Sequence, residues 1–323
     1  MNLLEVRHLE VGYPVAGAGL FSAARMLPVV RDCSLTLQAG RTLGVVGESG
    51  CGKSTLGRAL IRLIKPTGGA VLWQGEDMAG WTPEALRRRR AEFQIIFQDP
   101  VAALDPRMTL GRSVSRPLAT FAPGLSRADL QDRAVEVLAQ VGLGADFAGR
   151  YPHELSGGQA QRVGIARALI AGPKLIVCDE PVSALDVSIQ AQVVNLLMDL
   201  QDSLGLALVF ISHNLAVVRH ISHDIMVMCL GRVVEVAPRD AFYAKALHPY
   251  AQALMRAVPE PDPRRERGRI GQSLPGELPS VLTPPKGCVF ASRCPRVQAR
   301  CLEERPELRD FGGRQAACHF VEV

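Results

Sequence analysis

A run of glycines around one lysine is the segment of this sequence whose residue types point most directly to chemistry. It reads Gly47-Glu48-Ser49-Gly50-Cys51-Gly52-Lys53-Ser54-Thr55, after the apolar stretch Leu43–Val46 and before the helical pattern Leu56–Ile64. Glycines let backbone N–H groups converge on phosphate oxygens, and a following helix directs its N-terminus at the anion. Lys53 adds a positive charge, and Ser54 offers a hydroxyl to Mg²⁺. The order strand, glycine loop, helix therefore predicts a nucleotide site.

Two acids at the end of another apolar run would supply hydrolytic chemistry. Leu175–Cys178 leads directly into Asp179 and Glu180. An ion at the end of a buried strand needs a partner such as a metal, although a solvated strand end is the alternative. Asp179 is placed to hold Mg²⁺ through its water shell, and Glu180 to polarise the water that attacks the γ-phosphate.

A second glycine-containing segment, Leu155-Ser156-Gly157-Gly158-Gln159, opens a helical run that extends to Ile170. Ser156 alone is accounted for as a helix N-cap. A Ser-Gly-Gly at a helix start is also an anion cradle, and one nucleotide does not need two of them in one chain. A head-to-tail dimer does need both, with the cradle of one subunit closing on the γ-phosphate held by the other.

The elements expected to position these residues alternate between strands and helices. We expect strands at Leu3–Arg7, Val29–Leu37, Thr42–Val46, Ala70–Trp73, Leu175–Cys178, Leu206–Ile211, Ile225–Leu230 and Val233–Val236, a loop at 16–27, and helices at Arg127–Val141 and Gly158–Ile170. Alternating strands and helices predict a parallel sheet covered on both faces. The prediction is a phosphate-loop α/β domain (1–258) with an N-terminal antiparallel β portion and a helical insertion at about 104–170. A Pro/Arg-rich linker (259–285) and a cysteine-bearing extension (286–323) follow.

Composition excludes several classes of protein. A chain of 323 residues with 47% hydrophobic and 21% charged residues is an ordinary globular protein of about two domains. A net charge of +5 does not argue for nucleic acid, and Arg87–Arg90 is expected to be a solvated helix face. Apolar runs fall far short of the ~20 residues that span a bilayer, and the polar N-terminus does not fit a secretory signal. We therefore place the chain in the cytosol.

The eight cysteines divide into two groups. Cys33, Cys51, Cys178 and Cys229 are scattered through apolar segments, where buried reduced thiols are expected. Cys288, Cys294, Cys301 and Cys318 crowd the end of the chain without paired C-x-x-C spacing. Four reduced thiols suggest soft-metal ligation, by zinc or an iron–sulfur cluster, with unligated thiols as the alternative.

The glycine loop, the Ser-Gly-Gly segment and the Asp-Glu pair, in this order, resemble the ATP-binding cassette (ABC) family, whose signature sequence matches Leu155–Gln159 in full. The resemblance implies that Tyr13 stacks on adenine and that Gln98 contacts Mg²⁺ and a membrane subunit. It implies that His213 senses the γ-phosphate, and that Ser183, Ala184, Leu185 and Asp186 form a loop that crosses a dimer interface. The fold implied is an α/β P-loop NTPase.

The end of the chain gives a closer resemblance. His248-Pro249-Tyr250, Gly276-Glu277-Leu278-Pro279-Ser280 and Gly287-Cys288 look like the C-terminal extension of ATPase subunits of dipeptide and oligopeptide importers. Of the two unlike ATPases in such importers, Glu180–Val187 and Gly157-Gly158-Gln159 look more like the second, F-type, subunit. The resemblance implies ATP hydrolysis with Mg²⁺ that powers peptide uptake, and a [4Fe–4S] cluster on the four late cysteines, with zinc as the alternative. The implied partners are a second ATPase in a heterodimer, two membrane permeases and an extracytoplasmic peptide-binding protein. The implied location is the cytoplasmic face of the inner membrane, without nucleic acid.

Three other functions stay open at this point. The chain could serve an importer for nickel or another small solute, because cargo is chosen outside the ATPase. A soluble cassette ATPase acting on nucleic acid or ribosomes usually carries two cassettes, whereas this chain has one set of motifs. A regulatory module whose cysteines sense redox state fits less well with the presence of both Glu180 and His213.

Overall fold

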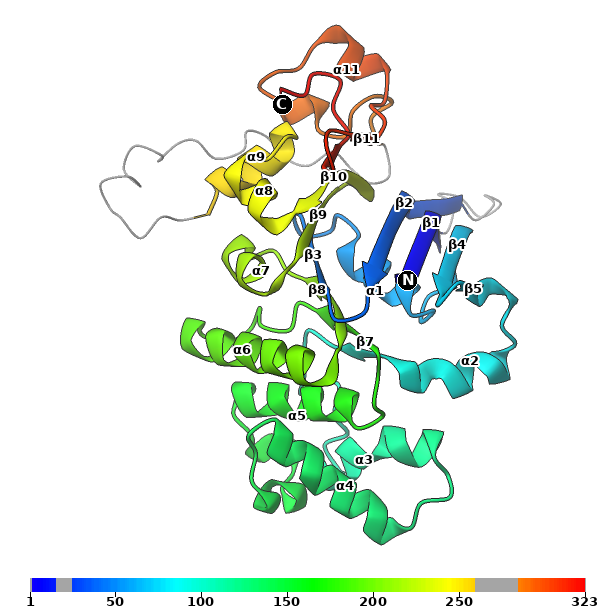
Figure 1. Ribbon diagram of the computed structural model, residues 1–323, viewed down its shortest axis with the longest axis vertical. Helices are drawn as coiled ribbons and strands as arrows, with labels where there is room; N and C mark the ends of the chain where they lie inside the picture. The colour runs from blue at the N-terminus through cyan, green and yellow to red at the C-terminus, as the bar shows by residue number, and fades with distance from the viewer. Residues whose placement is uncertain (1, 16–24, 259–283, 323) are drawn as a thin grey trace. The chain divides into compact units, whose positions relative to one another are not determined.

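The computed structural model describes residues 2–15, 25–258 and 284–322 (Figure 1). They divide into two compact units. Unit 1 comprises Met1–Leu3, Leu37–Thr42 and Glu76–Ile211, and unit 2 comprises Leu4–Thr36, Leu43–Gly75 and Ser212–Val323.

Unit 2 contains a mixed sheet whose strand order is β11-β12-β10-β9-β3. The strands are β3 (Thr42–Val46), β9 (Asp224–Cys229), β10 (Arg232–Pro238), β11 (Arg309–Asp310) and β12 (Gln315–Ala316). β3 and β9 are parallel, whereas β9–β10, β10–β12 and β12–β11 are antiparallel. The helices of this unit are α1 (Lys53–Leu60), α7 (Leu215–Ile221), α8 (Arg239–Ala244), α9 (Pro249–Arg256) and α11 (Ala299–Glu303). The C-terminal segment thus adds two short strands to the sheet that begins beside the glycine loop.

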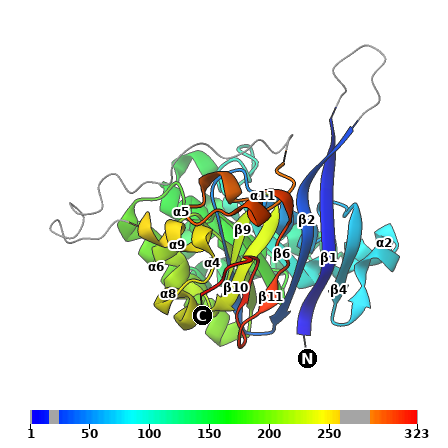
Figure 2. The same ribbon diagram turned by 90° about the horizontal axis from the view of Figure 1, so that it is seen from above.

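An antiparallel sheet with the order β2-β1-β4 forms the N-terminal part of unit 2 (Figure 2). Its strands are β1 (Asn2–Val15), β2 (Arg25–Gln38) and β4 (Gly68–Trp73), and β1 pairs with β4 from Leu4↔Trp73 to Glu10↔Gly68. This confirms the predicted antiparallel β portion. The predicted loop at 16–27 was wrong at its end, because β2 already begins at Arg25, and residues 16–24 lie outside the described residues. A long strand contains no turn residues that mark where it begins, so composition alone does not locate its first residue.

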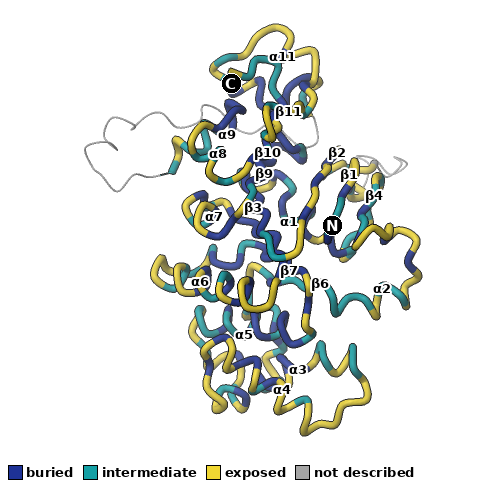
Figure 3. The backbone as a smooth tube through the Cα atoms, in the orientation of Figure 1, coloured by how far each residue is buried: buried dark blue, intermediate teal, exposed yellow. Residues whose placement is uncertain are grey.

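Unit 1 is built on three parallel strands, β6 (Phe93–Ile96), β7 (Leu175–Asp179) and β8 (Ala207–Ile211), with β7 in the middle. Every residue of β7 and β8 is buried (Figure 3), which explains their unbroken apolar sequences. Helices α3 (Leu110–Phe121), α4 (Arg127–Gln140) and α5 (Gly157–Leu169) pack against one another, and α5 also contacts α6 (Val187–Leu204) (Figure 1). The cluster of α3, α4 and α5 lies within the predicted helical insertion.

Short α2 (Pro83–Arg89) carries the arginine run on its last turn. Arg88 and Arg89 pair with Glu84 (3.6 Å) and Glu76 (2.8 Å), and the helix buries none of its residues. None of the helices in the described ranges combines the length and apolar character that crossing a bilayer requires.

Candidate nucleotide site and cysteine pocket

The glycine loop in unit 2 connects β3 to α1 and has a backbone that demands glycine at two points. Gly47 has φ 154° and Gly52 has φ 103°. A Cβ on Gly47 would lie 2.3 Å from the carbonyl oxygen of Met228, and one on Gly52 would lie 2.9 Å from that of Val29. The loop therefore turns tightly against neighbouring backbone and delivers the N-terminus of α1 to its own concave side.

Lys53, the first residue of α1, is 4% exposed and points back into the loop. Its ammonium donates to the carbonyl oxygens of Gly47 (2.8 Å) and Glu48 (3.0 Å). Ser49 and Gly50 are exposed, Gly52, Ser54 and Thr55 are half-buried, and Cys51 is buried. The loop thus presents one buried cation and the hydroxyls of Ser54 and Thr55 at a helix N-terminus, which is the donor set that a polyphosphate needs.

Tyr13, the residue predicted to stack on adenine, lies beside this loop. Its hydroxyl is 3.4 Å from the hydroxyl of Thr55, and 37% of the residue is exposed. The ring is therefore available for stacking at the edge of the loop.

His213 belongs to the same unit. The preceding Ser212 donates its N–H to the carbonyl oxygen of Val45 in β3 (3.2 Å), and Asn214 caps α7 by accepting the N–H of Ala216 (3.0 Å). These two contacts fix the exposed His213 between the end of β3 and the start of α7. It therefore lies on the side of the unit from which the glycine loop departs.

In unit 1, the predicted Mg²⁺ ligands Gln98 and Asp179 and the predicted base Glu180 lie at or just after the carboxyl ends of parallel strands. Gln98 is exposed just beyond β6, Asp179 is the buried last residue of β7, and Glu180 follows it. The N–H of Glu180 donates to the carbonyl oxygen of Ile211 at the end of β8 (3.1 Å). Because the strands are parallel, all three side chains start from one edge of the sheet.

Glu180 has φ 49°, in the left-handed region that a non-glycine residue seldom occupies. Such backbone conformations concentrate at functional sites, where the surrounding structure holds them in place. Here the Ser183 hydroxyl donates to the Glu180 carbonyl oxygen (3.1 Å), which ties the carboxylate-bearing residue to the segment after it.

The Ser-Gly-Gly segment forms the exposed start of α5. Ser156 Oγ accepts the N–H of Gln159 (3.3 Å), and Gln159 Oε1 accepts the N–H of Ser156 (3.0 Å), so the helix start is closed by a capping box. A Cβ on Gly158 would lie 2.6 Å from Cγ2 of Ile189 in α6. Glycine here lets α5 approach α6 closely while its N-terminus faces outward.

The segment 183–186 packs beside that helix start. A Cβ on Gly157 would touch Leu185 Cδ2 at 3.4 Å. Asp186 caps α6 by accepting the N–H of Ile189 (3.0 Å) and the hydroxyl of Ser188 (2.7 Å), and these bonds hold the pKa of its carboxyl below the usual range. Ala184 and Asp186 are exposed. Unit 1 thus gathers Gln98, Asp179, Glu180, the helix start and this segment, whereas unit 2 holds the glycine loop, Tyr13 and His213.

The four late cysteines, which are far apart in sequence, line one pocket of unit 2. Its lining consists of Cys288, Cys294, Cys301 and Cys318 together with His248, Pro249, Phe290, Ala291, Arg296, Pro306, His319 and Phe320. The other four cysteines are buried and scattered, as predicted. The sequence grouping of the thiols therefore corresponds to a grouping in space.

Burial favours the neutral form of three of these thiols and outweighs the backbone N–H groups that act on their sulfurs. Burial raises the pKa of Cys288 to about 11 and also raises the pKa of Cys294 and Cys318. In each case the backbone N–H two residues later lowers the pKa. The N–H of Phe320 lies 3.4 Å from Cys318 Sγ. Among the described residues no group of three or more His, Cys, Asp or Glu side chains is already drawn together as a metal-ligand set.

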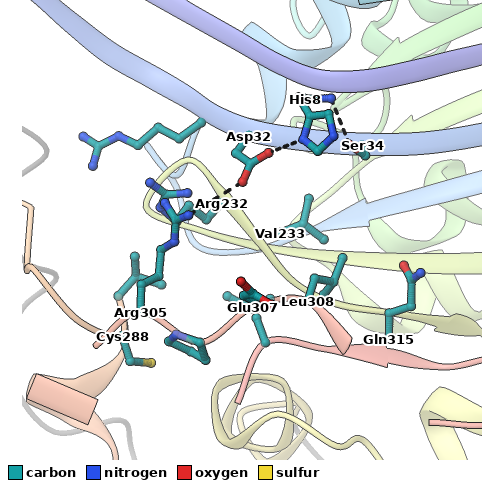
Figure 4. Close-up of a pocket in the computed structure, with 15 residues that line it drawn as sticks. His8, Asp32, Ser34, Arg232, Val233, Cys288, Arg305, Glu307, Leu308 and Gln315 are labelled. Carbon is teal, nitrogen blue, oxygen red and sulfur yellow. Dashed lines mark hydrogen bonds and ion pairs between the residues drawn. The ribbon is translucent and has the colours of Figure 1, made fainter. Parts of the chain in front are cut away.

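A further pocket of about 400 Å³ in unit 2 lies between β1, β2, β10 and the C-terminal segment (Figure 4). Asp32, one of the residues that line it, lies 2.8 Å from His8 Nδ1 and 3.9 Å from Arg305 Nη2. The residues that line it include none of the predicted nucleotide-binding residues. This pocket is therefore separate from the predicted nucleotide site.

Sequence reasoning missed two contacts of the glycine loop. Tyr250 Oη accepts the N–H of Glu48 (2.9 Å), and Arg293 binds both carboxylate oxygens of Glu48 (2.8 and 3.0 Å). Both partners come from the last quarter of the chain, and no local spacing signals them.

Comparisons with known proteins identify families and relatives to which this chain is similar. The ABC transporter family model covers residues 30–183, and the model for the oligopeptide/dipeptide transporter C-terminal region covers residues 234–301. The chain is 52% identical to the oligopeptide transport ATP-binding protein OppF of Salmonella typhimurium, over 99% of this chain and 96% of that protein. It is 47% identical to the dipeptide transport ATP-binding protein DppF of Escherichia coli, over 99% and 95%.

A solved structure extends the match to the fold. The dimeric, post-hydrolysis ATP-binding cassette MJ0796 bound to ADP and Pi is 28% identical, with a TM-score of 0.65 over 73% of this chain and 98% of that one. The glycine loop, the strand-end acids and the capped glycine helix start thus occur in a chain that is similar over its full length to peptide-transport ATP-binding proteins. The chain belongs to the ABC transporter ATP-binding proteins and carries the C-terminal region typical of oligopeptide and dipeptide transporters.

Proposed function

We propose that this chain is the ATP-hydrolysing subunit of an importer for dipeptides or oligopeptides. The observation that carries the proposal is its full-length similarity to oligopeptide and dipeptide transport ATP-binding proteins, including the C-terminal region. The buried Lys53 at a helix N-terminus and the strand-end acids supply the chemistry that such a subunit needs.

The residues divide the work by their chemistry. Lys53 and the backbone of the glycine loop bind the phosphates, and Tyr13 stacks on the base. Glu180 accepts a proton from the attacking water, and His213 contacts the γ-phosphate. A Mg²⁺ ion held by Ser54, Gln98 and Asp179 would neutralise phosphate charge, and the hydroxyl, amide and carboxylate oxygens of these residues are ligands that Mg²⁺ accepts.

The exposed start of α5 acts, in this proposal, on ATP held by a partner subunit. Leu155–Gln159 is closed by its own capping box, yet it presents a helix N-terminus outward, beside the exposed segment 183–186. That a similar cassette is a dimer with ADP and Pi supports a head-to-tail pair. We assign the partner as a second, unlike ATPase.

The remaining partners follow from the transporter class. We propose two permeases and an extracytoplasmic peptide-binding protein, with this chain bound at the cytoplasmic face of the inner membrane.

Reconstitution tests the proposal. The chain, purified with its copurifying partners and placed in vesicles with the binding protein, should take up a labelled tripeptide only with ATP, and Lys53→Ala should abolish uptake. The Lys65→Ala variant, which changes a lysine outside the glycine loop, is the matched control. Uptake of nickel without uptake of peptide would show that nickel, and not peptide, is the cargo. Copurification of the chain with ribosomes instead of permeases would contradict the proposal that it serves a transporter.

We further propose that Cys288, Cys294, Cys301 and Cys318 bind a [4Fe–4S] cluster. The support is that all four line one pocket and that the N–H of Phe320 donates to Cys318 Sγ (3.4 Å). The cluster would cross-link a C-terminal segment that is too short for a core of its own.

Metal analysis tests this second proposal. Protein purified without oxygen should be brown and contain about four iron atoms per chain. Cys301→Ser should lose the iron, whereas Cys33→Ser, which changes a buried thiol in β2, should retain it. Colourless protein with about one zinc per chain would replace the cluster with a structural zinc site.

A further inference from the structure

Three polar groups of one glycine-loop residue, Glu48, are each engaged by a different partner. Its N–H donates to Tyr250 Oη (2.9 Å), and its carbonyl oxygen accepts from Lys53 Nζ (3.0 Å). Its carboxylate accepts two bonds from Arg293, at 2.8 and 3.0 Å. Backbone and side chain of this residue are therefore fixed together, and its carbonyl is bonded to the lysine that binds phosphate.

The bond to Arg293 is well protected from water. The Arg293 side chain is 7% exposed, and that of Glu48 is 23% exposed. A two-pronged guanidinium–carboxylate pair fixes orientation as well as distance, and low exposure reduces the screening that weakens surface pairs. Such a contact has the geometry to hold a loop in one conformation.

Two of the partners of Glu48, Arg293 and Tyr250, are neighbours of residues that line the cysteine pocket. Arg293 lies in the short helical turn Ala291–Arg293, where its N–H donates to the Phe290 carbonyl oxygen (3.1 Å), and Cys294 follows it directly. Tyr250 is fully buried in α9, and its ring centroid lies 5.2 Å from that of Phe290, which lines the pocket. The packing of this pocket therefore sets where the two partners of Glu48 stand.

We propose that Arg293 is a positioning residue of the nucleotide site, through which the cysteine module (residues 284–322) holds the glycine loop in its ATP-binding conformation. The inference rests on the proposed role of the glycine loop in binding ATP, but it does not depend on which metal the cysteines hold. Loss of the Arg293–Glu48 contact lets the Glu48 side chain move. The Glu48 carbonyl oxygen, which accepts a hydrogen bond from Lys53, is then no longer held in place through that side chain.

Nucleotide titration of the purified full-length chain tests the proposal. Arg293→Gln should raise the dissociation constant of MgATP about tenfold, within the range seen for residues that couple two sites. Arg293→Lys keeps the charge but loses the second hydrogen bond. Its dissociation constant for MgATP should lie between those of the wild type and Arg293→Gln. Arg300→Gln is the control, because Arg300 is an exposed arginine of the same module that pairs with Glu304 (2.6 Å). Its MgATP affinity should equal that of the wild type.

A double-mutant cycle distinguishes positioning from simple anchoring. Glu48→Gln combined with Arg293→Gln should weaken ATP binding no more than either change alone, since both remove one interaction. If Arg293 only anchors the C-terminal segment, the variant will unfold at lower temperature while its ATP affinity stays at the wild-type value. That result would overturn the proposal.

Hydrogen exchange in the wild-type chain gives a test that needs no variant. Binding is reciprocal, so saturating MgATP should slow amide exchange in residues 288–294. Unchanged exchange there, with ATP bound, would overturn the proposal even if the variants fail to fold. A wild-type chain that binds no ATP would instead overturn the proposed function, and this inference with it.

Discussion

The glycine loop of unit 2 and the Ser-Gly-Gly segment of unit 1 both start a helix, yet they are fixed in opposite ways. Glu48 in the loop bonds to Tyr250 and Arg293, which lie 202 and 245 positions later in the chain. Ser156 and Gln159 bond to each other across three positions. A helix start capped by its own residues is complete before any other segment arrives. A loop held by distant residues depends on the rest of the chain.

This difference matches the work proposed for each region. The capped start of α5 is exposed and ready to meet another subunit, so a fixed local shape serves it well. The glycine loop binds the nucleotide of its own chain, and its shape is open to influence from the C-terminal segment. Two experiments separate the two regions, and a third measures a smaller effect in unit 2 at the start of α9, the helix that carries Tyr250.

The largest separation should come from Glu180→Gln, which changes unit 1 and leaves the glycine loop untouched. Turnover by the assembled complex should fall at least ~100-fold, the scale of losing a positioned general base, while MgATP affinity stays unchanged. Phosphate release and equilibrium binding measure the two quantities. Glu136→Gln, on the exposed face of α4, is the control and should retain full turnover. A turnover rate within about twofold of the wild type would show that Glu180 is not the general base.

Ser156→Arg asks whether the capped helix start serves the partner's ATP. The larger, charged side chain fills the position proposed for the γ-phosphate, so turnover by the complex should fall about 100-fold, the lower end of the scale for losing an oriented donor. ATP crosslinked at Lys53 of the same chain should stay at the wild-type level, and ATP held by the partner should decrease. Ser126 caps α4 with the same kind of capping box, so Ser126→Arg is a matched control for loss of a cap. Loss confined to the Lys53 site would contradict the head-to-tail arrangement.

The smallest effect concerns Glu235, a fully buried carboxyl on β10 that holds the start of α9. It accepts the N–H groups of Leu247 (2.8 Å) and His248 (2.7 Å). Burial raises its pKa to about 7, against the lowering effect of these two bonds and of Arg314. The unfolded carboxyl ionises at lower pH than the folded one, so this group stabilises the fold below pH 4.5 and the contribution is lost as pH rises through about 7.

Thermal and urea unfolding at two pH values measure this contribution. The free energy of unfolding should be about 1 kcal/mol higher at pH 6 than at pH 8 on account of Glu235, and Glu235→Gln should remove that difference. Glu84→Gln, on exposed α2, should leave the pH dependence of the wild type unchanged. Equal pH dependence in wild type and Glu235→Gln would contradict the raised pKa.

The same contrast explains what the sequence could predict. The glycine loop, the strand-end acids and the Ser156 helix start have local patterns, and strand β3 has the predicted bounds Thr42–Val46. The Arg293–Glu48 pair has no pattern, because any arginine and glutamate can pair once the fold brings them together. Strands β11 and β12 have two residues each, which is too short for alternation to appear.

Those two short strands have a consequence for handling the protein. β12 pairs with β10 through Glu235↔Ala316 and Val236↔Gln315, on the side of β10 opposite to β9. A chain shortened before Gln315 would leave the outer N–H and C=O groups of β10 open to strands of other molecules. The C-terminal residues therefore also protect the protein against aggregation, so a version trimmed for crystallisation or labelling should keep them.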